Sequence, residues 1–158
     1  MDSINLVLAF FFVLANGFFV AAEFAIVKVR STQLTELAEQ GSVRAKMARR
    51  LTRHLDAYLS ATQLGITLSS LALGWIGEPA FEHVIRPLFG DFYSEKVGAT
   101  AAFTIISVLH IVLGELAPKS VAIQKPVGTS LWIAHLLHAF YVVTFPAIWL
   151  LNGISRAI

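Results

Sequence analysis

Four long apolar stretches, separated by polar segments, set the pattern of the chain. They cover residues 3–27, 57–76, 97–117 and 127–152. A helix needs about 20 mostly apolar residues to cross the hydrocarbon core of a bilayer. The pattern therefore predicts an all-α integral membrane protein, in which the first three stretches are transmembrane helices.

Composition supports this class and excludes others. Of the 158 residues, 56% are hydrophobic and 14% are charged, and the mean hydropathy is +0.71. Soluble globular proteins carry about 25% charged residues. The absence of cysteine excludes a disulfide scaffold and thiolate metal sites, and the net charge of +2 gives no reason to expect a nucleic-acid partner. No nucleophile–base pair, phosphate-binding loop or zinc motif is present, so we expect a single membrane domain over residues 1–158 that is not an enzyme.

Charged residues predict the side of the membrane that each segment faces. Segment 28–53 holds seven of the twelve lysines and arginines, whereas the 78–95 loop holds four carboxylates and one arginine. Cytoplasmic segments carry the excess of lysine and arginine. We therefore expect the N-terminus outside, and the end of the third stretch inside.

The basic connector over residues 28–56 has its own apolar pattern. Six apolar residues recur at roughly helical spacing around a break at Gly41: Leu34, Leu37, Ala38, Ala45, Ala48 and Leu51. Two arrangements fit this pattern. The connector is either a solvated helical hairpin or a pair of interfacial helices with the apolar face toward lipid and the basic face toward headgroups, and we favour the second. Its arginines Arg49, Arg50 and Arg53 should then face headgroups or solvent, because a charge at the bilayer centre is costly.

The fourth stretch is ambiguous. Its length would allow a crossing, yet two histidines and Pro146 interrupt it. Its aromatic residues Trp132, Tyr141 and Trp149 are spread along it, which is typical of a helix in the membrane interface. Physical arguments leave a crossing helix and an in-plane helix equally open.

Polar residues inside the predicted spans are the candidate functional residues, because each needs a partner in lipid. They are Asn16 and Glu23 on the first helix, Gln63, Thr67, Ser69 and Ser70 on the second, and Gly114, Glu115 and Lys119 at the end of the third. Pro118 has no N–H to donate to the carbonyl of Gly114, so this oxygen is offered beside the Glu115 carboxylate. Carbonyl, carboxylate, hydroxyl and amide oxygens together suit a hard cation such as Mg²⁺.

Each candidate also has a structural interpretation. Glu115 can form an ion pair with Lys119, and Asn16 can make an interhelical hydrogen bond. Threonine and serine hydroxyls in membrane helices often bond to their own backbone. Glu23, Gln63 and Lys119 are interpreted as gating or structural polar groups. Small residues repeat at every fourth position, at Gly17, Ala21 and Ala25 and again at Ala61, Gly65 and Ser69, and suit either an intrachain bundle or a dimer.

Three motifs resemble the transmembrane domain of the CorC/cyclin M family of magnesium transporters. They are NGFFVAAEFA (16–25), YLSATQLGITLSSLALGWIGE (58–78) and GELAPK (114–119). The resemblance implies three transmembrane helices, a cytoplasmic-side belt of juxtamembrane helices (about 31–54 and 127–152) and a homodimer in the cell membrane. It also implies Mg²⁺ export in exchange for Na⁺, with regulatory ATP-binding CBS domains downstream. The stretch 127–152 then does not cross, and the C-terminus is cytoplasmic.

The resemblance further implies a cation site. Its ligands would be Asn16, Ser70 with Ser69 and Thr67 near it, the Gly114 carbonyl and Glu115. Eukaryotic members resemble a Ser-Gly-x-Phe-Ser-Gly pattern where this chain has Asn16 and Val20, so one hydroxyl ligand is missing here. We expect transport by alternating access. The alternatives are a dimeric membrane anchor or sensor that does not transport, and a passive divalent-cation channel.

Overall fold

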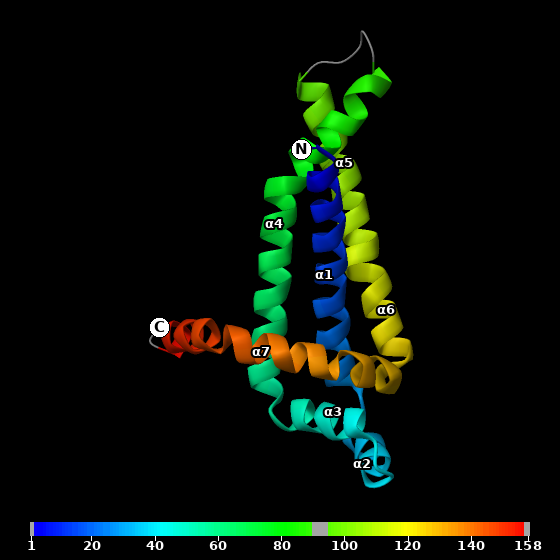
Figure 1. Cartoon of the computed structure of the whole chain (residues 1–158), viewed down its shortest axis with the longest axis vertical. Helices are drawn as coiled ribbons and strands as arrows, with labels where there is room; N and C mark the ends of the chain where they lie inside the picture. The colour runs from blue at the N-terminus through cyan, green and yellow to red at the C-terminus, as the bar shows by residue number, and fades with distance from the viewer. Residues whose placement is uncertain (1, 90–94, 157–158) are drawn as a thin grey trace.

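The computed structural model describes residues 2–89 and 95–156, and this part of the chain is helical without strands (Figure 1). The elements in chain order are α1 (Asp2–Lys28), α2 (Ser31–Glu39), α3 (Val43–Arg53), α4 (Leu55–Phe89), α5 (Glu95–Leu109), the π-helix η2 (His110–Leu116), α6 (Ala117–Gln124) and α7 (Pro126–Arg156). The prediction of an all-α protein is confirmed.

Four segments of the described chain are long and apolar enough to cross a membrane. They are Ile4–Lys28, Leu55–Phe81, Lys96–Gln124 and Pro126–Ile154. The first three run alongside one another, with α1 in contact with both α4 and α6 (Figure 1). Helix α7 lies across the others near the end where α1 finishes and α4 begins. The molecule is thus a bundle of three long helical segments, with a fourth helix lying across one end.

Helix α4 extends well beyond the apolar stretch that the sequence defines. The stretch ends at Ile76, whereas the helix continues through Pro79 to Phe89. The predicted 78–95 loop is therefore helix as far as Phe89, and residues 90–94 lie outside the described part. Pro79 and Pro87 both lie within this helix and do not end it, because each proline removes only one backbone hydrogen bond.

The basic connector forms two short helices that meet at Gly41. This glycine has φ +97°, a left-handed conformation that side chains disfavour. The Ser42 hydroxyl then accepts a hydrogen bond from the Ala45 amide at 3.2 Å and caps α3. The sequence places the break between α2 and α3 at the same position.

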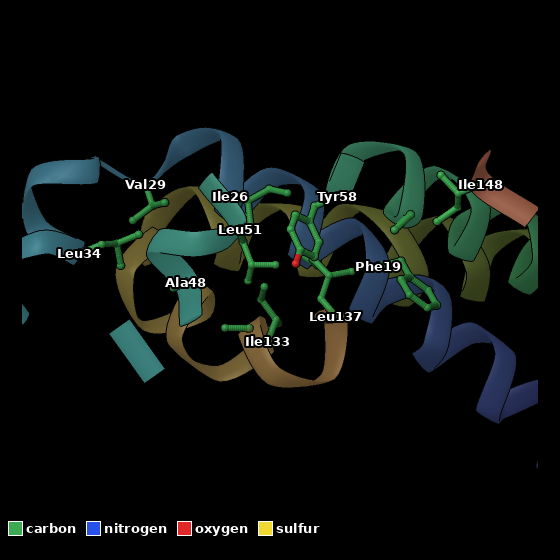
Figure 2. Close-up of a cluster of buried hydrophobic side chains, with 13 residues drawn as sticks. Phe19, Ile26, Val29, Leu34, Ala48, Leu51, Tyr58, Ile133, Leu137 and Ile148 are labelled. Carbon is green, nitrogen blue, oxygen red and sulfur yellow. The ribbon is translucent and has the colours of Figure 1, made fainter. Parts of the chain in front are cut away.

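The apolar face of α2 and α3 packs on protein. Leu34, Ala48 and Leu51 have no exposed surface and lie against Ile133 and Leu137 of α7 and the end of α1 (Figure 2). The expectation that this face meets lipid is wrong, because α3 packs on α7 and α2 packs on α3.

The belt arginines lie away from the bundle core. Arg50 and Arg53 are exposed and Arg49 is half-buried. This agrees with the expected position of the guanidinium groups outside the bundle.

The small-residue stripes serve contacts within this chain. Ala21 and Ala25 of α1 pack against Ala122 of α6. On the other side of α1, the ring of Phe19 lies so close to Gly65 of α4 that an added Cβ would be 2.5 Å from it. The two stripes therefore bring α4 and α6 close to α1.

Helix α7 has one packed and one exposed face. Ile133 and Leu137 are fully buried, whereas Val143 is 78% and Trp149 69% exposed. The Tyr58 hydroxyl of α4 is hydrogen-bonded to His138 Nδ1 at 2.7 Å. Helix α7 is thus fixed to the bundle along one side and presents apolar side chains on the other.

Candidate metal site at the crossing of three helices

The Asn16 side chain joins three helices at one buried point. Asn16 lies on α1 and is 2% exposed. Its amide nitrogen Nδ2 donates to the carbonyl oxygen of Gly114 in η2 at 2.9 Å. Its oxygen Oδ1 accepts from the hydroxyl of Ser70 in α4 at 3.2 Å. Three of the predicted site residues, from three parts of the sequence, are therefore in direct contact.

The orientation of this amide follows from hydrogen-bond chemistry. A backbone carbonyl only accepts, so the side-chain atom beside the Gly114 oxygen has to be the NH₂ group. The oxygen Oδ1 is then directed at Ser70, whose hydroxyl can donate. Any flip of the amide would set two acceptors against each other at Gly114.

The backbone around Gly114 is widened. Residues 110–116 form a π-helix, and the Ala117 amide donates to the Val112 carbonyl five residues back. Pro118 cannot supply the amide that an α-helix would give to Gly114. Short π segments within α-helices occur frequently at functional sites.

Two glycines allow the helices to approach this closely. An added Cβ on Gly17 would be 2.9 Å from the Pro118 ring and 3.0 Å from the Leu113 carbonyl oxygen. An added Cβ on Gly114 would be 2.8 Å from the His110 ring. Sequence reasoning assigned Gly17 to a packing stripe and missed its place at the site. The sequence carried a signal for this contact: Gly17 directly follows the polar Asn16 in the first helix, and Gly114 and Pro118 mark the turn that this helix meets.

Chemically, the crossing offers three neutral oxygens that suit a hard cation. They are Asn16 Oδ1, Ser70 Oγ and the Gly114 carbonyl. In the present structure these groups are hydrogen-bonded to each other. A cation on the Gly114 oxygen would have to displace the Asn16 Nδ2 group, and rotation of the same amide would present Oδ1 instead.

The other serine and threonine candidates lie elsewhere on α4. Ser69 is buried and lines an apolar groove beside Phe19. Thr67 is exposed, and its hydroxyl donates to the Gln63 carbonyl at 2.9 Å, which is the structural interpretation of this residue. Gln63 is exposed as well. The structure does not bring Thr67 or Gln63 to Asn16.

The charged candidates flank the crossing without entering it. The Glu115 side chain is exposed, and within residues 2–89 and 95–156 it forms no ion pair with Lys119. The Lys119 ammonium instead lies 4.6 Å from the centre of the Phe24 ring. Glu23 is half-buried. The ion pair between Glu115 and Lys119, which was the structural alternative to cation binding, is thus absent from the described residues. The Glu115 carboxylate remains available as a cation ligand.

No preformed cage of charged ligands is present in the described part of the chain. Those residues contain no group of three or more His, Asp or Glu side chains that could hold a metal ion. A metal at the crossing would therefore depend on neutral oxygens and one nearby carboxylate.

Comparison with known sequences identifies the family. Residues 7–158 match the family described as the Cyclin M transmembrane N-terminal domain. The UPF0053 protein YhdT of Bacillus subtilis (strain 168) is 49% identical over 162 residues, which cover 99% of this chain and 35% of YhdT. The UPF0053 protein YugS of the same strain is 47% identical over 155 residues, covering 95% of this chain and 36% of YugS. In Synechocystis sp. (strain ATCC 27184 / PCC 6803 / Kazusa), the UPF0053 protein sll0260 is 33% identical over 164 residues, covering 99% of this chain and 37% of sll0260.

The chain spans about a third of the length of these relatives. The family match covers nearly all of it and includes the three motifs that suggested the resemblance. The chain belongs to the cyclin M transmembrane domain family.

Proposed function

We propose that this membrane domain binds Mg²⁺ at the crossing of α1, α4 and η2 and exports it from the cytoplasm in exchange for Na⁺. The observation that carries the proposal is the meeting of Asn16, Ser70 and the Gly114 carbonyl at one buried point. Membership of the cyclin M family supports a role related to divalent-cation transport.

The donor set suits Mg²⁺ in kind and in strength. Mg²⁺ prefers oxygen ligands, gives up its waters reluctantly and is usually held by one or two carboxylates with several waters retained. Asn16, Ser70 and Gly114 would supply neutral oxygens, and Glu115 would supply the negative charge. A site with one carboxylate binds a divalent ion weakly enough to release it during transport.

The distribution of the ligands over three helices suits alternating access. Each neutral ligand belongs to a different helix, so a relative movement of α1, α4 and η2 would break the set. The ion would enter from the cytoplasmic side near Glu115, and the bundle would then close below it and open outside. Competition by Na⁺ would favour release.

We further propose that three helices cross the membrane and that α7 lies in its cytoplasmic interface. Two observations support this arrangement: α7 lies across the bundle, and its exposed face carries large apolar side chains such as Trp149 (Figure 1). Helix α3 of the basic connector packs on α7, which supports a cytoplasmic position for both. The N-terminus would then be outside and the C-terminus inside. A homodimer, followed in the full-length protein by CBS domains that bind ATP, completes the proposal.

Calorimetric titration of the purified chain with Mg²⁺ tests the site. We expect Glu115→Ala to abolish binding, because a partly dehydrated divalent ion is held poorly by neutral oxygens alone. Ser70→Ala and Asn16→Ala should weaken it less, since a water can partly replace one neutral ligand. Glu23→Gln is the matched carboxylate control and should leave binding largely intact. If Glu115→Ala binds like the parent while Glu23→Gln does not, the assignment is wrong.

Transport itself is tested by Mg²⁺ flux in proteoliposomes. Flux that rises with an opposing Na⁺ gradient and disappears in Glu115→Ala supports an exchanger. Flux without dependence on Na⁺ would instead indicate a passive channel. Binding without any flux would indicate an anchor or sensor module.

A further inference from the structure

A long apolar groove opens along one side of the bundle, separate from the crossing at Asn16. It has a volume of about 700 Å³ and lies between α1, the η2–α6 segment and the first turns of α7. Its walls carry Leu14 and Phe18 of α1, Val121 of α6 and Trp132 of α7. Leu14, Val121 and Trp132 are each more than half exposed, so the groove is open at the side.

One end of the groove is cationic. Lys125 is exposed in the short link between α6 and α7 and is the single charged residue among the described residues that line the groove. The adjoining Gly128 and Thr129 belong to the first turn of α7, where the Thr129 amide donates to the Lys125 carbonyl at 3.0 Å. The groove thus combines apolar walls with a positive charge at one end.

This combination matches the two parts of an anionic phospholipid. An acyl chain would fill the apolar part of the groove between α1 and α6, and the phosphate would lie at Lys125. A second copy of the chain is a poorer match for this end of the groove. Segment 28–56, at the same end of the molecule as α7, carries seven basic and three acidic residues, so this end of a second copy offers no net negative charge to Lys125 (Figure 1).

A second groove provides a comparison within the same molecule. It has a volume of about 600 Å³ and lies between α1, α4 and α7, with Phe12 and Phe140 among its lining residues. No charged residue lines it in the described part of the chain. The second groove therefore lacks a positive charge that would favour an anionic headgroup.

We propose that the groove between α1, α6 and α7 is a binding site for one anionic phospholipid, with the phosphate at Lys125 and an acyl chain against α1 and α6. The deepest wall of this groove includes Gly17 and Pro118, which pack against each other. Asn16 precedes this glycine, so the bound acyl chain would press on the back of the same helix crossing. The proposal concerns lipid binding and stands whether or not the crossing binds Mg²⁺.

Native mass spectrometry of the purified chain tests the proposal. The chain is titrated in detergent with phosphatidylglycerol or with phosphatidylcholine of the same acyl chains. We expect one phosphatidylglycerol to be retained in preference to phosphatidylcholine. Lys125→Gln should lower the affinity for phosphatidylglycerol about fivefold and leave phosphatidylcholine unchanged, since each lysine near an anionic surface contributes about that factor. Lys46→Gln, which removes an exposed lysine from α3, is the matched control and should change neither.

A second variant blocks the groove without disturbing the fold. An added Cβ at Gly128 meets nothing within 4 Å, so Gly128→Leu should be accommodated and should occupy the groove. We expect it to abolish retention of the bound lipid. Gly153→Leu, in the same helix and equally unobstructed, is the control and should retain it.

Three results would overturn the proposal. The first is equal retention of the two lipids by the parent chain, and the second is an equal loss in Lys46→Gln and Lys125→Gln. The third is a change of oligomeric state in Gly128→Leu with lipid retention unaltered, which would assign the groove to a second copy of the chain.

Discussion

The side-chain amide of Asn16 donates to the carbonyl oxygen of Gly114 at 2.9 Å, across 98 residues of sequence. The same amide accepts the Ser70 hydroxyl, so one side chain links the first, second and third long helices. Its carbonyl partner lies in the widened turn next to Pro118. The Asn16 amide thus pairs with one polar group on each of the other two helices. Both of these groups lose this partner when the amide is removed.

Removal of the amide should destabilise the bundle. Asn16→Ala leaves the buried Gly114 oxygen and the half-buried Ser70 hydroxyl without this partner, which costs about 1–3 kcal/mol. Thermal or denaturant unfolding in detergent measures the effect. Asn152→Ala is the control, because the Asn152 side chain is half-buried in a polar notch with no hydrogen bond inside the described structure. Equal losses in the two variants would contradict the role given to Asn16.

Gly114→Ala should be destabilising where Gly74→Ala is not. The added methyl group at Gly114 meets His110 at 2.8 Å and Asn16 Nδ2 at 3.3 Å, so the helices have to separate. Such overpacking costs roughly 1–3 kcal/mol. At Gly74, within α4, an added Cβ meets nothing within 4 Å, and alanine there should be neutral or stabilising by up to about 1 kcal/mol. Melting temperatures of the two variants in detergent, measured beside the parent, give the comparison.

Tyr58→Phe should loosen α7 without unfolding the bundle. The substitution removes the 2.7 Å hydrogen bond to His138 and keeps the ring, whose centre lies 4.8 Å from that of Tyr141. Loss of one hydrogen bond is worth about 1 kcal/mol, which corresponds to about fivefold faster amide exchange from local opening of α7. Hydrogen–deuterium exchange of α7 peptides measures this. Tyr141→Phe is the matched control, since no hydrogen bond of its hydroxyl is seen within the described residues, and it should exchange like the parent.

The topology makes a separate prediction. The chain has no cysteine, so a single introduced cysteine can be labelled without background. Ser155→Cys should react with a membrane-impermeant reagent from the cytoplasmic side, because the proposed topology has an in-plane α7 and the C-terminus inside. Ser3→Cys should react from outside and serves as the opposite control. Labelling of Ser155→Cys from outside would show that α7 crosses the membrane.

Features that depend on local chemistry were predictable from the sequence. Apolar runs of bilayer length predicted long helices, and Gly41 predicted the break between α2 and α3. Pro118 indicated that the Gly114 carbonyl would lack the amide partner that an α-helix supplies. Each of these inferences needs only the hydrogen-bonding capacity of one residue or the length of one segment.

Features that depend on which helix faces pack against each other were not predictable from the sequence. The apolar face of α3 around Leu51 was expected to meet lipid and packs on α7 instead, because lipid and protein interiors are equally apolar. Ser70 and Thr67 are close to one face of the same helix, yet α1 covers only Ser70. The π-helical winding of residues 110–116 was not predicted either, because Pro118 indicates a missing hydrogen bond to Gly114 but not how the turn is wound.

The contact between α1 and the widened turn is made largely of main chain and a proline ring. Gly17 and Gly114 have no side chain that could rotate aside, and the Pro118 ring has almost no torsional freedom. Apart from the Asn16 amide and the His110 ring, the contact has no side chain whose rotation could open it. Rotation of the Asn16 amide can uncover the Gly114 oxygen, but any wider opening requires α1 and η2 to move apart as rigid bodies.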